Sequence, residues 1–109
     1  MGVAFTFRHM ESSDALKEYA EEKIGKLQKL LRAPIEAEVV ASLEKHLHCV
    51  DISVSAGGKR YHGREESDDM YASIDLVMDK IGRQVRDDKD SATQRKRTSG
   101  GFAAASGKK

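Results

Sequence analysis

The chain has 109 residues, of which 39% are hydrophobic and 34% are charged, and its formal net charge at pH 7 is +1. This length predicts one domain with a tail rather than two domains, and the high charge content predicts an ionic surface around a modest core. No apolar run approaches the ~20 residues of a membrane span, and no secretory signal opens the chain. The lone Cys49 cannot form an internal disulfide and is typical of a reducing compartment. We therefore expect a soluble, cytoplasmic protein.

The first predicted element is a short strand over residues 3–8, in which apolar side chains alternate with small or polar ones. Ser13 then provides an N-cap for a helix predicted over residues 14–32. We expect this helix to end before Pro34, because the residue before a proline is pushed out of the helical conformation. Its apolar stripe consists of Leu16, Ala20, Ile24, Leu27 and Leu31.

Two more strands are predicted at residues 35–44 and 50–56, joined by a connection at residues 45–48. Gly57-Gly58 suits the positive φ angles of a tight hairpin and leads into a fourth strand at about residues 59–66. If these glycines form the loop, the register follows from them. The predicted cross-strand pairs are Ala56 with Lys59, Ser55 with Arg60, Val54 with Tyr61, Ser53 with His62, Ile52 with Gly63 and Asp51 with Arg64.

A long amphipathic helix is predicted over residues 68–89. Its apolar stripe contains Met70, Ile74, Val77, Ile81 and Val85. Acidic residues precede or open it, where the helix dipole favours negative charge. Basic residues follow at a spacing of three, which falls short of a full turn, so they wind slowly around the side away from the stripe. These residues are Lys80, Arg83, Arg86 and Lys89.

The order strand, helix, strand, strand, strand, helix predicts an α+β fold, with a four-stranded sheet and both helices packed on one face. The first two strands can be parallel neighbours, because the helix between them is long enough for a crossover, whereas the later strands are antiparallel. Residues 1–91 form the predicted domain. Residues 92–109 are small, polar and basic, and we expect them to be a disordered basic tail.

The first helix also carries basic residues, Lys23, Lys26 and Lys29, in a stretch without acids. Two basic helical surfaces suit a polyanion. Residues 36–51 instead carry Glu36, Glu38, Glu44 and Asp51 against only Lys45, which predicts an acidic outer sheet face that avoids a polyanion. Lys23 lies close to the apolar stripe and has two interpretations. Its stem can cover the core while its charge emerges at the rim, or it can point into a groove between the helices.

The sequence shows no catalytic constellation, and we expect no enzymatic activity, no cofactor and no small-molecule substrate. His48 and Cys49 are adjacent on a strand and point to opposite faces, so they and the nearby His46 and His62 do not converge on a metal ion. A helix cap explains residues 12–14 better than a nucleophilic set does.

The second half of the chain carries residues that match a known family. They are Asp69-Met70-Tyr71-Ala72-Ser73-Ile74-Asp75, Asp79-Lys80-Ile81, Arg83-Gln84-Val85 and Lys89-Asp90, with further matches at Met10-Glu11, Ala15-Leu16, Lys26-Leu27, Glu44-Lys45, His48, Asp51, Gly58 and His62. On these residues the chain resembles the ribosome hibernation-promoting factors and ribosome-associated translation inhibitors, also called sigma-54 modulation proteins. The similarity covers about residues 1–90 and is closest to the short form, which has no C-terminal dimerisation domain.

The resemblance implies a fold similar to double-stranded-RNA-binding domains and a role in bacterial stress response and stationary phase. Proteins of this family bind the small ribosomal subunit over the sites of messenger and transfer RNA, and translation stops. The implied partners are the small ribosomal subunit and its ribosomal RNA, with no membrane. The implied RNA-binding residues are Lys80, Arg83, Arg86, Lys89, Lys23, Lys26 and Lys29. Asp87 and Asp88 depart from the family, because relatives often have Lys or His there.

Two other functions stay open at this point. One is a protein-interaction module that modulates a transcription factor, and the other is a general double-stranded-RNA binder. The dependence of binding affinity on salt concentration distinguishes the protein-interaction module from an RNA binder. Neutralising phosphates releases counterions, so the affinity of an RNA binder falls steeply as salt rises, whereas that of a mainly apolar protein interface does not. A general binder would take up free duplexes as readily as ribosomes.

Overall fold

The computed structural model of the chain describes residues 1–95, with side chains through residue 88. Its elements follow the predicted order and confirm the α+β class. Their bounds are β1 Gly2–Arg8, α1 Asp14–Gln28, β2 Glu36–Glu44, β3 Leu47–Ala56, β4 Lys59–Ser67 and α2 Met70–Arg95.

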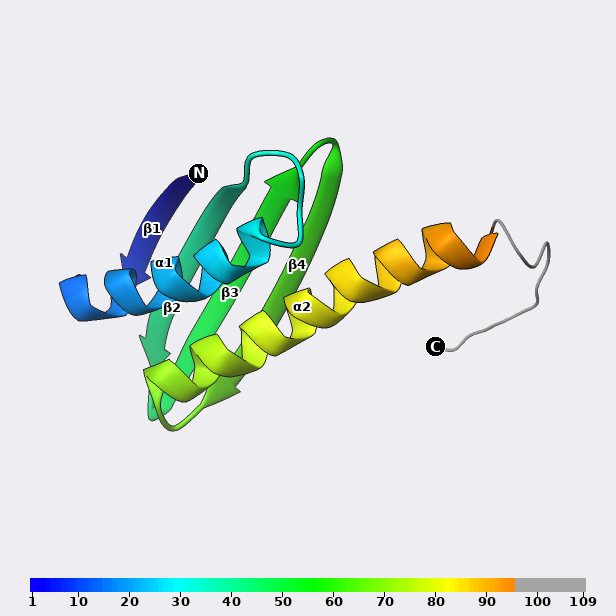
Figure 1. The fold of residues 1–109 in the computed structure, drawn as a ribbon. Helices are drawn as coiled ribbons and strands as arrows, with labels where there is room; N and C mark the ends of the chain where they lie inside the picture. Colours follow the sequence, from blue (N-terminus) through cyan, green and yellow to red (C-terminus); the bar gives the residue numbers. More distant parts are fainter. Residues whose placement is uncertain (96–109) are drawn as a thin grey trace.

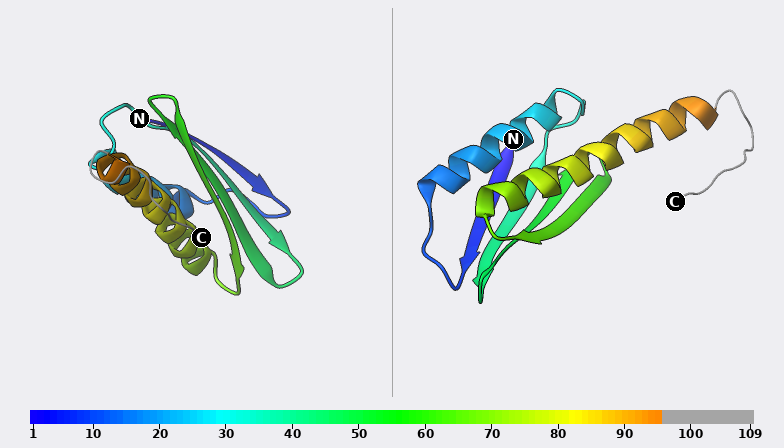
Figure 2. Two further views of the ribbon diagram at one scale, coloured as in Figure 1. Left: turned by 90° about the vertical axis from the view of Figure 1, so that its right-hand side faces the viewer. Right: turned by 90° about the horizontal axis from the view of Figure 1, so that it is seen from below.

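The strands form one sheet in the order β1-β2-β3-β4. β1 is parallel to β2, and the other neighbouring strands are antiparallel, as the crossover argument predicts. Both helices lie side by side on the same face of the sheet (Figures 1 and 2). The result is a two-layer domain whose second sheet face is open.

The hairpin between β3 and β4 has the predicted register. Gly57 and Gly58 have φ angles of 58° and 81°, and all six predicted cross-strand pairs are present. Asp51 stands opposite Arg64 but does not form its ion pair there. Asp51 Oδ1 lies 2.8 Å from His62 Nε2, while Arg64 contacts Glu66 at 3.4 Å.

The connection between β2 and β3 is shorter than the sequence predicts. β3 begins at Leu47 rather than at residue 50, and Leu47 pairs with Glu44, so only Lys45 and His46 form the loop. Lys45 has a φ of 59°, in the left-handed region. Lysine seldom adopts this conformation, so the sequence carried no turn signal here.

α1 ends at Gln28, whereas the sequence predicts an end at residue 32. The Gln28 side chain organises the loop that follows, because its Nε2 donates to the carbonyls of Leu31 at 3.1 Å and Ala33 at 2.9 Å. Its Oε1 accepts from the Ile35 backbone N–H at 3.0 Å. These three bonds give the loop backbone the hydrogen-bond partners that a longer helix would have provided. The helix can therefore end several residues before Pro34.

The core lies between the sheet and the two helices. Both predicted helical stripes are buried, except that Leu31 lies in the loop and is only half-buried. The largest fully buried side chains are Ile24, Ile35, Ile52, Ile74, Ile81, Val50, Val54, Val77 and Val85. Each such side chain contributes roughly 1.5–3 kcal/mol through its removal from water.

α2 begins at Met70, behind a set of hydrogen bonds that ties it to the sheet. Asp69 caps it, since its Oδ2 accepts from the Ala72 N–H at 3.1 Å. Ser73 is fully buried, and its Oγ donates to the His48 carbonyl at 2.6 Å and lies 2.7 Å from Ser67 Oγ. The first turn of α2 is therefore pinned to both β3 and the end of β4.

Further along, α2 packs closely on β4 at Gly63. A Cβ at this position would lie 3.2 Å from Cγ1 of Val77 and 3.4 Å from the Val77 carbonyl oxygen. Only a residue without a side chain lets the helix come this near the strand. The close approach brings the fully buried Val77 and Ile81 onto the sheet.

α2 also covers the outer edge of β4 with three polar side chains at successive turns, which we name the edge row: Lys80, Gln84 and Asp88. Gln84 Nε2 donates to the His62 carbonyl at 2.6 Å, and Gln84 Oε1 accepts from the His62 N–H at 3.1 Å. The Gln84 amide thus replaces the two bonds that a neighbouring strand would form with His62.

α2 continues to Arg95, beyond residue 92, where the sequence predicts the start of the tail. Residues 92–95 therefore belong to the helix. Residues 96–109 lie outside the described residues, and the disordered tail stays a prediction for them. Within residues 1–95, no helix is both long enough and apolar enough to cross a membrane.

Replacing Gly63 with valine is expected to lower the free energy of unfolding by about 1–3 kcal/mol, because the new side chain must push α2 away from β4. Urea unfolding followed by circular dichroism measures the change. Gly25, in α1, is the matched control: nothing lies within 4 Å of a Cβ there, so alanine should stabilise the protein by about 0.5–1 kcal/mol. A Gly63→Val protein as stable as the parent would contradict the close contact.

Candidate nucleic-acid interface

The two helices run in the same direction along the sheet, so their second halves lie at the same end of the helical layer (Figure 1). Each helix changes charge along this direction. Residues 14–22 contain four acids and one lysine, whereas residues 23–32 contain four basic residues and no acid. In α2, residues 70–79 contain two aspartates and no base, whereas residues 80–86 contain three bases and no acid. In both helices the acidic residues come first and the basic residues follow, which is the order that the helix dipole favours.

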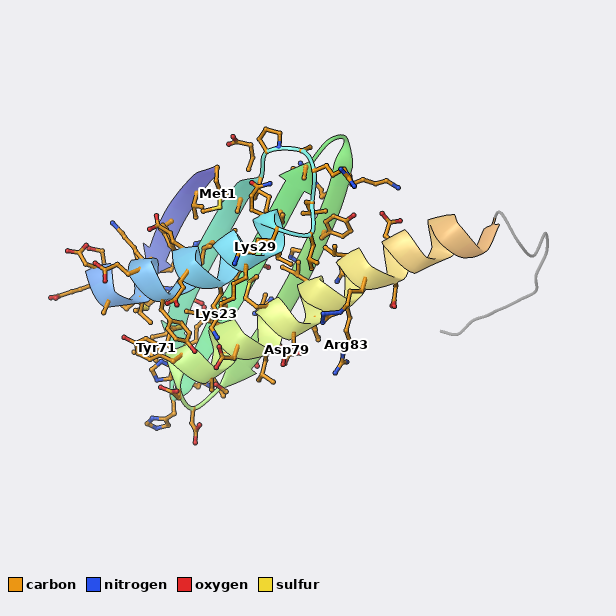
Figure 3. The ribbon with its side chains drawn as sticks, in the orientation of Figure 1. Met1, Lys23, Lys29, Tyr71, Asp79 and Arg83 are labelled. Atoms are coloured by element: carbon orange, nitrogen blue, oxygen red, sulfur yellow. The ribbon has the colours of Figure 1, made fainter. Side chains whose placement is uncertain are left out.

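Four of the predicted RNA-binding residues are exposed in the second halves of the helices or, for Lys29, directly after the end of α1. We name them the basic end: Lys26, Lys29, Arg83 and Arg86. None of them forms an ion pair within the part of the chain that the structure describes. Figure 3 shows Lys29, directly after the end of α1, and Arg83 on α2 towards the same end of the layer. Their charges are therefore available to a ligand.

Arg86 has a defined place on α2. Its Nη2 lies only 3.3 Å from where a Cβ of Gly82 would stand, so its guanidinium folds back over that glycine. Gly82 thereby gives the planar group a flat surface of helix to rest on. A guanidinium held in this way loses less conformational freedom when it binds a phosphate.

Lys23 lies between the two helices. Its Nζ is 3.6 Å from Asp75 Oδ1 on α2 and 5.2 Å from the centroid of the Tyr19 ring. This position agrees with the second interpretation from the sequence, in which Lys23 points into the groove between the helices. Because Asp75 already neutralises part of its charge, Lys23 is less available to a phosphate than the basic end is.

Lys80 points elsewhere than the sequence predicts. A step of three residues turns about 60° short of a full turn, so Lys80, Arg83 and Arg86 point in three different directions. Lys80 faces the edge of β4, where its Nζ lies 2.5 Å from Glu65 Oε2 and 3.5 Å from the Arg64 carbonyl. Its charge is paired within the chain. Lys89, the last member of the predicted set, lies beyond the described side chains.

Asp88 has a structural contact that sequence reasoning missed. Its carboxylate accepts from the Tyr61 hydroxyl at 3.0 Å and lies 3.3 Å from Lys59 Nζ, which ties α2 to the start of β4. The signal in the sequence was its spacing of four from Gln84 and eight from Lys80, which places all three on one side of the helix. Asp87, by contrast, is exposed.

The open face of the sheet is mixed in charge, which corrects the acidic face predicted from residues 36–51. The hairpin register brings Arg60 and Arg64 of β4 onto this face, and Arg8 joins them from β1. A shallow hollow of about 250 Å³ lies there. It is lined by Arg8, Val40, Ser42, Glu44, Cys49, Asp51 and Arg64. This face therefore gives no strong electrostatic preference for or against a polyanion.

The structure shows what the serine cap and the His and Cys residues noted in the sequence do. Ser13 caps α1 as predicted, since its Oγ accepts from the Leu16 N–H at 3.2 Å. Among the described residues, no group of three or more His, Cys, Asp or Glu side chains is placed to hold a metal ion. Cys49 is buried against the open face of the sheet.

Comparison with known proteins gives this helical layer its context. The model of the family described as "Sigma 54 modulation protein / S30EA ribosomal protein" matches residues 3–93. The chain belongs to this family. The match includes both helices and the whole sheet, so the basic end and the edge row lie inside the region that family members share.

Individual family members resemble the chain over nearly their whole length. The ribosome hibernation promoting factor of Salmonella typhimurium is 33% identical over 94 residues, which cover 86% of this chain and 99% of that protein. The N-terminal domain of Thermus thermophilus Protein Y has a TM-score of 0.74 and 30% identity, covering 80% of this chain and 98% of that one. A ribosomal subunit interface protein from Coxiella burnetii has a TM-score of 0.70 and 28% identity, covering 83% and 99%.

Two tyrosines are expected to ionise above the ordinary tyrosine pKa of 10.0. The hydrogen bond to Asp75 raises the pKa of Tyr19, and burial followed by the bond to Asp88 raises the pKa of Tyr61. Because each pKa is higher in the folded state, the stabilisation is complete below about pH 10 and is lost as pH rises through the raised values. Ultraviolet titration of tyrosinate in a Tyr71→Phe background measures both pKa values.

Asp88→Asn should lower the pKa of Tyr61 and leave that of Tyr19 unchanged, because the two tyrosines have different carboxylate partners. Asp87→Asn removes the same charge from the exposed neighbouring position and is the matched control. If both variants shifted Tyr61 equally, the effect would be one of net charge, and the Tyr61–Asp88 contact would not be its cause.

Proposed function

We propose that this chain is a ribosome-binding translation inhibitor that places its basic end against ribosomal RNA of the small subunit, in the channel used by messenger and transfer RNA. Membership of the family supports ribosome binding, since relatives bear the names ribosome hibernation promoting factor and ribosomal subunit interface protein. The observation that carries the RNA contact is the basic end itself: four exposed cations at one end of the layer, none of which has an ion-pair partner among the described residues.

Phosphate neutralisation supplies the affinity in this mechanism. Each neutralised phosphate releases counterions, and four contacts make affinity fall roughly tenfold when the salt concentration doubles. Arg83 and Arg86 can each bind a phosphate through two N–H groups, whereas Lys26 and Lys29 act as point charges. Contacts to phosphates carry no base sequence, so this surface recognises the shape of a folded RNA.

The seven cations predicted from the sequence do not contribute equally. The four residues of the basic end contribute most, because nothing in the described chain neutralises them. Lys23 and Lys80 contribute less, since binding a phosphate means sharing or breaking their contacts with Asp75 and Glu65. Lys89 stays in the set on the strength of the sequence.

Inhibition needs no catalysis, because a domain bound in the channel excludes messenger and transfer RNA sterically. Because its partner is the ribosome, we also expect the protein in the cytoplasm.

The orientation of α2 on the sheet is fixed by its hydrogen-bonded first turn, by its close packing at Gly63 and by the edge row. The position and rotation of α2 are thus fixed before binding, which limits the entropy lost when Arg83 and Arg86 bind.

Charge reversal of Arg83 and Arg86 together to glutamate is expected to weaken binding to small ribosomal subunits by about 100-fold, because like charges would then face each other. Cosedimentation over a series of salt concentrations measures the affinity and its salt dependence. Lys80→Gln is the control within the same helix, and it should weaken binding less than about fivefold, because Glu65 already neutralises Lys80.

Cosedimentation of the double variant like the parent at moderate salt would refute the assigned surface. A weak dependence on salt for the parent would favour the transcription-factor module. Equal binding of free RNA duplexes and ribosomes would favour the general double-stranded-RNA binder.

A further inference from the structure

The β1 edge of the sheet has backbone groups that face away from the domain. The Gly2 N–H donates to the Ile35 carbonyl at 3.0 Å, so Gly2 and every second residue after it have their N–H and C=O groups towards β2. The residues between them point these groups outward, and no side chain within residues 1–95 bonds to them, unlike the edge row on β4. Such an edge can pair with another strand. The outward residues are Val3, Phe5 and Phe7.

The side chains of β1 do little to protect this edge. Proteins commonly protect an edge strand with lysine, proline or a bulge, but the only charged residue of β1 is Arg8, at its end. Val3, Phe5 and Phe7 lie on the helical side of the sheet and are only half-buried. The rings of Phe5 and Phe7 stack along the strand, with 6.3 Å between ring centroids and 12° between ring planes. An apolar row thus borders the outward backbone groups.

The sequence of β1 is complementary to itself when two copies run antiparallel. A pairing centred on Phe5, the middle residue, uses the whole strand. On the helical side, Phe5 then stands opposite Phe5 of the second copy and Val3 opposite Phe7. Each of these pairs exchanges two backbone hydrogen bonds, because all three residues point their backbone groups outward. On the open side Ala4 stands opposite Thr6, so apolar and small residues meet throughout and no like charges face each other.

The ends of the strand carry complementary charges in this register. Arg8 stands opposite Gly2 of the second copy. The Glu36 carboxylate lies over Gly2, since a Cβ at Gly2 would be only 2.8 Å from Glu36 Oε1. Arg8 and Glu36 are both exposed, and neither has an ion-pair partner among the described residues. Arg8 of one copy therefore meets Glu36 of the other, and the two-fold axis forms this pair twice.

We infer that two copies of this chain dimerise by antiparallel pairing of their β1 strands, which joins the two sheets into one. A strand from another protein would not require β1 to be complementary to itself. In each copy α1 crosses β1, and its first turn reaches past this edge (Figures 1 and 2). Antiparallel pairing carries the two first turns to opposite ends of the paired strands, so they do not collide. The basic end lies elsewhere, and the inference does not rest on the proposed function.

Sedimentation equilibrium of the full chain measures self-association as a function of concentration. One strand pair gives an interface at the small end of the usual range, so we expect monomers at about 1 µM and a large dimer fraction at about 500 µM. The two-fold contact uses each β1 edge once, so association through it stops at two copies. A chain that stayed monomeric over this whole range would overturn the inference.

Amide hydrogen exchange at the two concentrations locates the contact. The N–H groups of Val3, Phe5 and Phe7 should exchange about fivefold more slowly in the concentrated sample, because they gain carbonyl acceptors from the second copy. The His62 N–H on β4 is the internal reference, since Gln84 accepts from it in both states. Protection that appeared at His62 and not at the three β1 groups would place the interface at the other edge and overturn the inference.

A charge exchange tests the register. Arg8→Glu should weaken the dimer about tenfold, because it places like charges at both ends of the strand pair, and Glu36→Arg should do the same. The double variant Arg8→Glu/Glu36→Arg restores opposite charges and should return the affinity to within about threefold of the parent. Recovery in the double variant excludes loss of folding as the cause of the weaker dimers.

Arg60→Glu is the matched control, because it makes the same change of charge on the same sheet face but on β4. It should leave the dimer unchanged. Equal weakening by Arg60→Glu and Arg8→Glu, or no recovery in the double variant, would overturn the inference. The Arg83→Glu/Arg86→Glu protein should dimerise like the parent while losing ribosome binding, so the inference and the proposed function can fail separately.

Discussion

The contact between α2 and β4 determines which charges of this protein are available. Gly63 lets the helix approach the strand, and the edge row then reaches the backbone and side chains of β4. Together these contacts fix the rotation of α2 about its own axis. Because that rotation is fixed, Lys80 is committed to Glu65, while Arg83 and Arg86 are left exposed. A helix turned by one residue would present a different set of cations, so packing at a glycine determines the electrostatics of the opposite side.

The direction of the helices has a topological origin. β1 and β2 are parallel, so α1 must run back across the sheet between them. The antiparallel strands that follow return the chain to the end where α2 can start beside the beginning of α1. Two helices whose sequences each change from acidic to basic then align their charges instead of cancelling them. This alignment is why a chain with a net charge of only +1 can have two ends of opposite character.

Periodicity and turn chemistry were sufficient to predict the element order, both buried stripes and the register around Gly57-Gly58, because these depend on neighbours in sequence. The end of α1 could not be predicted in this way, since Gln28 bonds to backbone groups of a loop that exists only after folding. The same limit applies to the cations. In the sequence, Lys80 and Arg83 look equivalent on the polar side of one helix. They differ in the structure because Glu65, on β4, forms an ion pair with Lys80.

The Gln84 bonds to His62 have a consequence for how copies of this protein can associate at high concentration. Growth of a continuous sheet from many copies needs two open edges on every copy. Here His62, in the middle of the β4 edge, is already bonded to an amide from the protein's own helix, whereas β1 is the other edge of the sheet. A strand that adds to β4 must first displace Gln84, so sheet growth through this edge costs contacts of the native domain.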